Sequence, residues 1–489
     1  MKPSKCEMKR FFLVVMLAIC TVPVQAGARQ NILNGGMTMS EEYDSNRYET
    51  EDDRVEYWQT VLAPSLSLLS SGNHDILDLT YEPEITYDHQ REINDIEHNL
   101  SLTLDREFSD RLRGSLFNEF SYFDYDEVDV GAAGDLVGQF IRADDYVQAE
   151  VVRILFPELG EYTEEDYTYV LSELEERYDR ASPVQQAQVD RLLLPSDRGR
   201  RRHSTNDLTF ELEYEFAEDS NVSVGYTLST LNDHSADIAE RTDHQPCFSI
   251  SYRFNPQWRA ELAYEYIASN FKGDQVDERG HDSEFRLDFD LTPHDLLYLS
   301  YDFSSLEYRG EGDDHVEQES GLGWEHDFDT QTSLNVYLGG SYEKRDISGD
   351  ERGYEANATF SREMQHARWT LEADGGYDEY KEGGDWDDLR RYVTLRGDLI
   401  FDLRENLSSD FSLLYERNIS WSGTGGGRTE ITDNDYEASL GITYTFLRWY
   451  SVSVTYAFHR LNTDGPVRDD YDDHQVFLEF SAMKELFRW

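Results

Sequence analysis

One pattern dominates this sequence: apolar and polar residues alternate strictly, in segment after segment, from about residue 36 to the last residue. The stretches 208–216, 285–291 and 436–446 are clear examples, with an apolar residue at every second position and mainly charged or hydroxylated residues between. A period of two predicts β-strands with one apolar and one polar face, because successive side chains point to opposite sides of a strand. On a helix the same residues would scatter around the circumference, which argues against a helical fold here.

The connections between these segments alternate in length. Short ones include 217–221, 254–257 and 292–295, whereas long, acidic, glycine-rich ones separate the other pairs of segments. The long connections predicted on this basis are 231–245, 270–282, 308–316, 345–353, 379–388, 420–434 and 461–474. Short turns on one rim and long loops on the other are typical of a transmembrane, antiparallel, up-and-down β-barrel. We therefore predict an all-β fold of about 20 strands (roughly 18–22), an even number that places both termini at the periplasmic rim.

The composition supports a sheet with one apolar face and one water-exposed, acidic face. The 489 residues include 100 Asp or Glu against 44 Lys or Arg, yet 13% of the chain is aromatic. In a barrel the apolar face contacts lipid, the aromatic residues gather at the membrane interfaces, and the acids face water. A secreted soluble β-sandwich or propeller would also alternate and is the competing fold. The net charge of −56 excludes nucleic acid as a partner, because a phosphate backbone requires Lys and Arg.

The N-terminal residues predict export. Residues 1–26 have four basic residues, then an apolar stretch of ten residues from Phe11 to Cys20, and end on Val24-Gln25-Ala26. These are the parts of a secretory signal peptide, and the apolar stretch is too short to span a bilayer. Cleavage after Ala26 removes four positive charges and one negative charge, so the net charge changes from −56 to −59. We predict Sec export to the outer membrane of a Gram-negative cell.

Two N-terminal stretches and the C-terminus carry a family resemblance. Residues 40–48 (SEEYDSNRY), residues 60–68 (TVLAPSLSL) and the final Phe487-Arg488-Trp489 resemble the beta-barrel porin 2 family of outer-membrane barrels, which includes barrels associated with exosortase and exopolysaccharide systems. The resemblance implies a porin-like or export role and transfers no catalytic residue. Phe487 and Trp489, which end an alternating strand, resemble the signal that directs barrels to their assembly machinery.

One predicted outer connection, 127–203, breaks the alternating pattern. It contains three predicted helices: the first ends at Pro157, the second begins at Thr163, and the third begins at Ser182-Pro183. This helical insert either folds into the barrel as a plug or packs outside it as a cap.

A basic cluster follows the insert, consisting of Arg198, Arg200, Arg201 and Arg202. Arginine binds phosphate through two parallel hydrogen bonds, so the cluster suits lipopolysaccharide phosphates at the outer rim. It would equally neutralise acids of the lumen or remain solvated.

The acidic residues of the polar face are the candidate functional residues. Rings of carboxylates in a pore favour cations, so we predict a cation-favouring channel or a barrel associated with exopolysaccharide export, whose solutes are small cations or polysaccharide. The predicted lumen residues are Glu82, Glu84, Glu211, Glu213, Glu215, Glu261, Glu265, Asp288, Asp290, Glu372, Asp374 and Glu437. A closed structural or adhesive barrel is the alternative function.

An enzyme is not predicted, and neither a cofactor nor a metal site is. Neighbouring acid–histidine pairs such as Asp243-His244 and Asp473-His474 are expected by chance among so many acids, and sequence position alone does not identify a catalytic triad.

Overall fold

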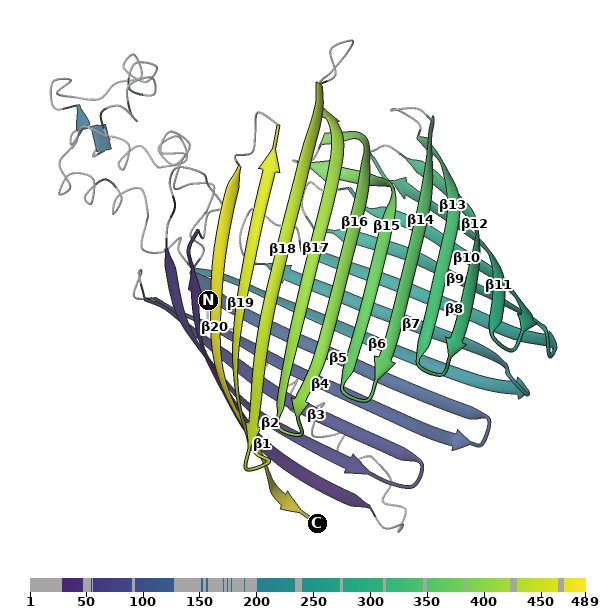
Figure 1. The fold of residues 1–489 in the computed structure, drawn as a ribbon, viewed down its shortest axis with the longest axis horizontal. Coiled ribbons are helices and arrows are strands. Elements are labelled where there is room, and N and C mark those ends of the chain that lie inside the picture. Colours follow the sequence, from purple (N-terminus) through teal and green to yellow (C-terminus); the bar gives the residue numbers. More distant parts are fainter. Residues whose placement is uncertain are drawn as a thin grey trace.

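The computed structural model places twenty antiparallel strands in one closed sheet (Figure 1). It describes residues 29–46, 54, 56–89, 93–126, 151–152, 155–156, 170, 174, 177, 189, 200–233, 240–272, 276–310, 314–345, 350–382, 385–422, 429–464 and 470–489. The strands are β1 Gln30–Asp44, β2 Tyr57–Ser71, β3 Asp75–Asp88, β4 Ile93–Ser109, β5 Leu112–Asp126, β6 Arg200–Ala217, β7 Ser220–Asp233, β8 Arg241–Asn255, β9 Trp258–Phe271, β10 Glu278–Thr292, β11 Asp295–Tyr308, β12 His315–Asp329, β13 Thr332–Arg345, β14 Asp350–Met364, β15 Ala367–Glu382, β16 Asp385–Arg404, β17 Leu407–Ser422, β18 Thr429–Phe446, β19 Tyr450–Thr463 and β20 Tyr471–Arg488. The predicted all-β, antiparallel barrel and its number of strands are confirmed.

The first and last strands close the barrel. Each strand pairs with its neighbours in sequence, and β1 pairs with both β2 and β20. The β1–β20 register runs from Ile32 opposite Arg488 to Asp44 opposite Gln475. Beyond it, Asn31 and Trp489 exchange two backbone hydrogen bonds of 2.9 and 3.0 Å. Closure therefore leaves neither terminal strand with an open edge, and the C-terminal residue takes part in the seam.

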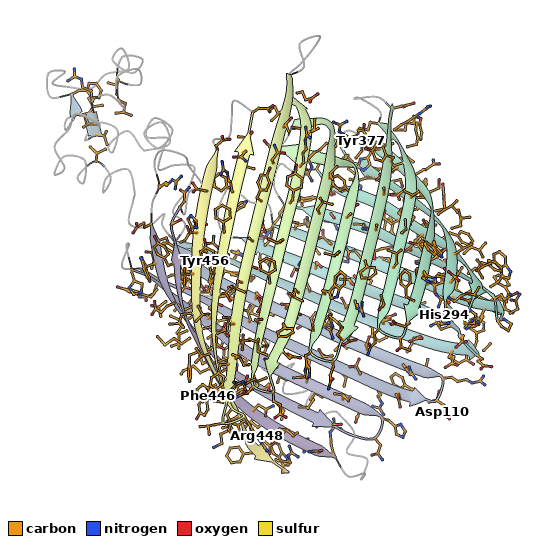
Figure 2. The ribbon with its side chains drawn as sticks, viewed as in Figure 1. Asp110, His294, Tyr377, Phe446, Arg448 and Tyr456 are labelled. Carbon is orange, nitrogen blue, oxygen red and sulfur yellow. The ribbon has the colours of Figure 1, made fainter. Side chains whose placement is uncertain are left out.

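The two rims differ as the sequence predicts. The turn rim carries connections of two or three residues, such as 110–111, 256–257 and 447–449. The start of β1 and the end of β20 also lie at this rim, where Asn31 pairs with Trp489. Figure 2 shows Asp110, His294 and Arg448 at the ends of these hairpins. The loop rim carries the longer connections, except that β15 and β16 are separated by only two residues, 383–384. Within the described residues, no helix has the length and apolarity needed to cross a bilayer.

Several strands extend further toward the loop rim than predicted. β8 begins at Arg241, β15 and β16 reach Glu382 and Asp385, and β20 begins at Tyr471, so much of the predicted loops 231–245, 379–388 and 461–474 is strand. The prediction was wrong there because acidic residues do not end a strand whose backbone still has a partner. The same correction applies to 200–203, predicted as part of the insert, which begins β6.

The predicted insert falls mainly outside the described residues, so its fold and its position remain predictions. Phe156 donates a backbone hydrogen bond to Val152, and the Arg177 guanidinium lies 5.1 Å from the centre of the Phe156 ring. The described residues that have helical conformation and are almost fully buried are Val151, Val152, Leu155, Val170, Leu174 and Val189.

Prolines interrupt the ladder at two places. Pro64 of β2 and Pro83 of β3 face each other where the β2–β3 pairing has a gap between Leu62–Ile85 and Leu66–Tyr81. Pro246 lies at a similar gap between β8 and β9. Proline has no N–H to donate, so the two β2–β3 prolines share a single gap in the ladder. The gap lies in the middle of both strands.

The register separates an apolar face from a polar face around the whole sheet. On the apolar face, large side chains are exposed, including Leu322 at 66% and Leu338 at 62% of their maximal area. On the polar face of the same two strands, glycines accommodate aromatic rings: a Cβ on Gly323 would lie 1.9 Å from the Tyr298 ring. The Tyr298 ring is 8% exposed, stacks at 6.1 Å on Tyr337, and has the Arg286 guanidinium 3.9 Å above it.

Four tyrosine–histidine pairs recur at one level of the apolar face. Each tyrosine is six residues beyond the first residue of its strand, namely Asp75, Ser220, Trp258 or Tyr450. Its hydroxyl lies 2.6–2.9 Å from Nδ1 of a histidine on the next strand. The pairs are Tyr81–His98, Tyr226–His244, Tyr264–His281 and Tyr456–His474. Figure 2 shows Tyr456 near the middle of β19, away from the turn rim at Arg448. Polar side-chain atoms thus begin at a common level on this face.

The packing of rings over glycine gives a test of the fold. We predict that Gly323→Ala lowers the free energy of unfolding by about 1–3 kcal/mol, because the added methyl displaces the Tyr298 ring from a filled site. Gly340→Ala is the matched control, since its Cβ would meet nothing nearer than a backbone oxygen at 3.8 Å. Urea unfolding of the folded barrel measures both. Equal midpoints for the two variants would contradict this packing.

Candidate functional site

The twelve sequence-predicted lumen residues all lie on the polar face. The register links them from strand to strand: Glu211 faces Gly225 on β7, Gly225 faces Cys247 on β8, and Cys247 faces Glu265 on β9. The structure does not bring the twelve together in one ring. They fall into groups that differ in their ion-pair and hydrogen-bond partners, and these partners determine how much negative charge each part of the polar face carries.

One group is neutralised by arginines near the turn rim. Asp288, 3% exposed, accepts hydrogen bonds from Arg259 at 2.7 and 3.0 Å and from Arg286 at 2.7 Å. Asp290 pairs with Arg253 at 3.0 Å, and Glu261 lies 3.5 Å from Arg259. Desolvated carboxylates of this kind persist because cations and hydrogen bonds compensate them. We call Arg253, Arg259, Arg286 and their acidic partners the arginine zone.

A second group lies further from the turn rim on β9–β12 and has a different character. Glu265 is opposite Asp282, while Asp302 is opposite Glu284 on one side and Glu319 on the other. Among the described residues, none of these five carboxylates forms an ion pair with Lys or Arg. They line a hollow of about 600 Å³ together with Ser223, Cys247 and Ser304. We call these five residues the carboxylate belt.

The belt is unfavourable for the sheet itself. Like charges directly opposite each other on neighbouring strands destabilise the pairing by a few tenths to about 1 kcal/mol per pair. Glu319 receives a 2.7 Å hydrogen bond from Tyr337, whose ring also covers Gly321. A row of uncompensated carboxylates held in place by neighbouring side chains is an arrangement suited to attracting cations.

Only one residue of the belt, Glu265, is among the predicted lumen residues. Asp282, Glu284, Asp302 and Glu319 are not among them, although the alternating pattern places each on the polar face. Asp282 fell in a predicted loop that the structure shows to be part of β10. The signal that distinguishes the belt is the register between strands, which the sequence does not state.

The remaining predicted acids are dispersed around the sheet. Glu84 faces Glu97, and Glu372 faces Arg396. Asp374 receives a hydrogen bond of 3.4 Å from Tyr392, and Glu437 faces His459. Glu82 lies opposite Asn99 on the same face as Glu84, and Glu215 opposite Asn221.

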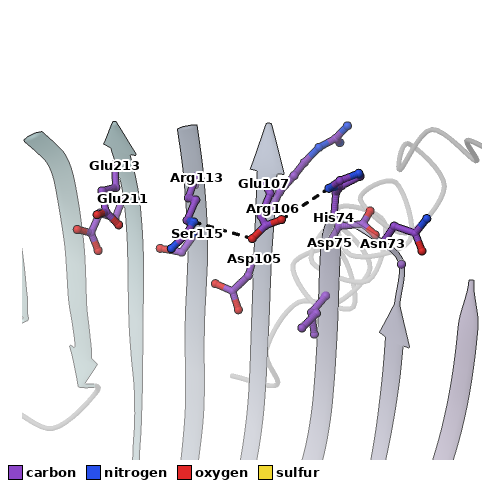
Figure 3. A pocket seen from close by; sticks show the side chains of 13 residues that line it. Asn73, His74, Asp75, Asp105, Arg106, Glu107, Arg113, Ser115, Glu211 and Glu213 are labelled. Carbon is purple, nitrogen blue, oxygen red and sulfur yellow. Dashed lines mark ion pairs between the residues drawn. The ribbon is translucent and has the colours of Figure 1, made fainter. Parts of the chain in front are cut away.

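A second hollow, of about 470 Å³, opens at the turn rim (Figure 3). Glu107 lies at its centre, 3.6 Å from His74 and 3.9 Å from Arg113. Glu211 and Glu213 also line it. Glu213 receives a 2.8 Å hydrogen bond from Asn221. This hollow is polar and exposed, and its charges are mixed, unlike those of the belt.

Of the predicted basic cluster, Arg198 lies outside the described residues. Arg200 and Arg201 begin β6, and Arg202 pairs with Asp124 of β5 at 3.1 Å. The predicted assembly signal lies at the seam, where Phe487 is opposite Leu33, and both Phe487 and Trp489 are more than 60% exposed. Asp243-His244 and Asp473-His474 lie on strands, so the two members of each pair point to opposite faces and form no joint site.

Solved structures share this fold. Similar chains are the FrpB iron transporter from Neisseria meningitidis (TM-score 0.56, 8% identity, covering 92% of this chain and 81% of that one) and a mutant of the ferric enterobactin receptor PfeA from Pseudomonas aeruginosa (0.52, 9%, 94% and 81%). The siderophore receptor PirA from Acinetobacter baumannii is similar too (0.51, 7%, 93% and 81%). The chain thus has the fold of outer-membrane β-barrels.

No family model matches the chain, and no curated protein matches its sequence. The resemblance to the beta-barrel porin 2 family is therefore not confirmed. The exopolysaccharide role that it implies remains a prediction from that resemblance alone.

The arginine zone yields a test of its structural role. We predict that Asp288→Asn lowers the free energy of unfolding by about 3 kcal/mol, because two arginines lose the charge that compensates them in a desolvated site. Glu363→Gln is the control, since it breaks a pair with Arg368 whose side chains are more than 60% exposed; its loss is below about 1 kcal/mol. Urea unfolding in lipid vesicles measures both. An equal loss in the two variants would show that the arginine zone is not structural.

Proposed function

We propose that this protein spans the outer membrane and forms a water-filled channel that favours small cations. The apolar face supports the first part, because exposed leucines around the whole sheet are unfavourable in water and favourable against lipid chains. The tyrosine–histidine pairs support it too, since amphipathic rings at one level are typical of a membrane interface.

The polar face then lines the lumen. Its charged groups need water or partners, and twenty strands close a cylinder wide enough to hold both water and side chains. In outer-membrane barrels the short turns and both chain termini face the periplasm, so the turn rim, where β1 begins and β20 ends, is the periplasmic rim in this proposal. Solutes that enter from outside meet the carboxylate belt before they meet the arginine zone.

The carboxylate belt is the observation that carries the cation preference. Each uncompensated acid raises the local concentration of cations and repels anions, and the effect is strongest where low-dielectric walls surround the charges. The arginine zone contributes less net charge for its number of acids, because three arginines compensate most of their five acidic partners, Asp219, Glu261, Asp288, Asp290 and Glu325. Selectivity therefore resides in the five belt residues and not in the total acidity of the chain.

A closed structural or adhesive barrel is the second candidate. The ring-over-glycine packing of Tyr298 and Tyr337 favours it locally, because these side chains fill part of the space inside the sheet. It predicts a correctly folded protein that conducts no ions.

Reversal potentials in planar bilayers test the proposal. We predict a cation preference for the unmodified protein that falls roughly threefold or more in the variant Asp282→Asn, Glu284→Gln, Asp302→Asn, because three belt charges are lost. The matched control removes three exposed acids of the turn rim by Asp110→Asn, Glu218→Gln and Glu405→Gln, and keeps the preference.

Two results count against the proposal. An anion preference, or the same reversal potential in both triple variants, would contradict selection by the belt. Absence of conductance from folded protein would favour the closed barrel.

A further inference from the structure

Three potential metal ligands meet on the polar face of β18 and β19. Asp435 and Glu437 are two residues apart on β18, so they share that face, and His459 of β19 lies directly opposite Glu437. One ligand atom from each of the three lies within 4.8 Å of the other two. Glu437 is a predicted lumen residue, but its proximity to a histidine 22 residues away depends on the strand register and does not follow from the sequence.

His459 is held in a defined orientation from two sides. Its Nε2 is 2.7 Å from Asp435 Oδ1, and its Nδ1 is 3.3 Å from the hydroxyl of Tyr471 on β20. Tyr471 is itself only 8% exposed. Histidines that bind metals usually have their second ring nitrogen fixed by a hydrogen-bond partner, which sets the tautomer and aims the ligating nitrogen. The side chains of His459 and Asp435 are about one-quarter exposed, so the group opens toward water.

Further oxygen atoms beside this group lack donors. Asp433, two residues before Asp435 on the same face, has a buried Oδ1 with no hydrogen-bond partner. Asn418 of β17 is directly opposite Asp433, and its Oδ1 is buried without a partner as well. Buried acceptors without donors are costly unless a cation or an ordered water is near. Among the described residues, neither Asp435 nor Glu437 forms an ion pair with Lys or Arg.

We propose that Asp435, Glu437 and His459 bind one divalent transition-metal ion of the Zn²⁺ or Mn²⁺ class. Two carboxylates and one imidazole suit these ions, whereas Ca²⁺ and Mg²⁺ prefer oxygen ligands alone. Without a metal, Nε2–H of His459 donates to Asp435. When a metal binds, Nε2 loses its proton and gives its lone pair to the ion, while the imidazole carries its proton on Nδ1, which donates to the Tyr471 hydroxyl. Water fills the remaining positions. The site does not depend on whether the channel conducts.

Calorimetric titration of the folded, metal-free full chain with Zn²⁺ tests this inference. An excess of Mg²⁺ occupies the oxygen-only acidic sites that the chain offers in large number. We expect one Zn²⁺ to bind per chain under this competition, with a Kd that rises tenfold or more in His459→Gln and in Glu437→Gln. The matched control is His326→Gln: His326 also lies 2.7 Å from an aspartate, Asp295, but within the described part of the chain it belongs to no group of three ligands.

The possible results distinguish a metal site from a purely structural role of the Asp435–His459–Tyr471 hydrogen bonds. Competition-resistant binding that is lost in both site variants and kept in the control supports the site. Binding that is equal in His459→Gln and the unmodified protein overturns it, as does the absence of any binding that survives Mg²⁺. Glu437 is exposed, so Glu437→Gln provides the decision if His459→Gln does not fold.

Discussion

Every other feature of this molecule depends on the pairing of its backbone in a closed ladder. In hydrocarbon an unpaired N–H or C=O costs several kcal/mol, so a sheet survives there only if it has no edge. The β1–β20 seam removes that edge and includes the C-terminal Trp489. Proline residues, which have no backbone N–H to donate, interrupt this pairing at few places. Pro64 and Pro83 face each other, so that both lie in one gap of the ladder. Closure also fixes which side chains face inward.

The same ladder explains how one face tolerates so many acids. Near the turn rim, arginines lie among the acids, and Asp288 is nearly inaccessible between two of them. Further from the turn rim, the acids of these strands no longer pair with arginines. There Glu284, Asp302 and Glu319 lie directly opposite one another on neighbouring strands. Because such a row weakens strand pairing, its presence indicates a role other than stability. On the same face, two acids and an imidazole converge around His459, which is the site proposed for a metal ion.

The sequence predicted whatever depends on the alternation within a single strand. Segment 208–216 forms half of β6, with its glutamates on the polar face, and the long connections lie on the rim opposite the short turns. It did not predict what depends on register, because a slip of one residue exchanges the two faces and changes every neighbour. Glu265 and Asp282 meet across strands, as do Asp435 and His459. Residues that are adjacent in sequence do not share a site on a strand: Asp473 and His474 point to opposite faces of β20.

The central claim is that one face contacts lipid while the other contacts water. Accessibility of single cysteines along β6, in residues 27–489 carrying Cys247→Ser so that no native cysteine remains, tests it most directly. In liposomes, a membrane-impermeant thiol reagent should modify cysteines at Thr209, Glu211 and Glu213. Cysteines at Phe210, Leu212 and Tyr214 should resist that reagent, and a fluorophore attached to them should be quenched by brominated lipid. Uniform reactivity along the six positions, or the reverse alternation, would contradict the account.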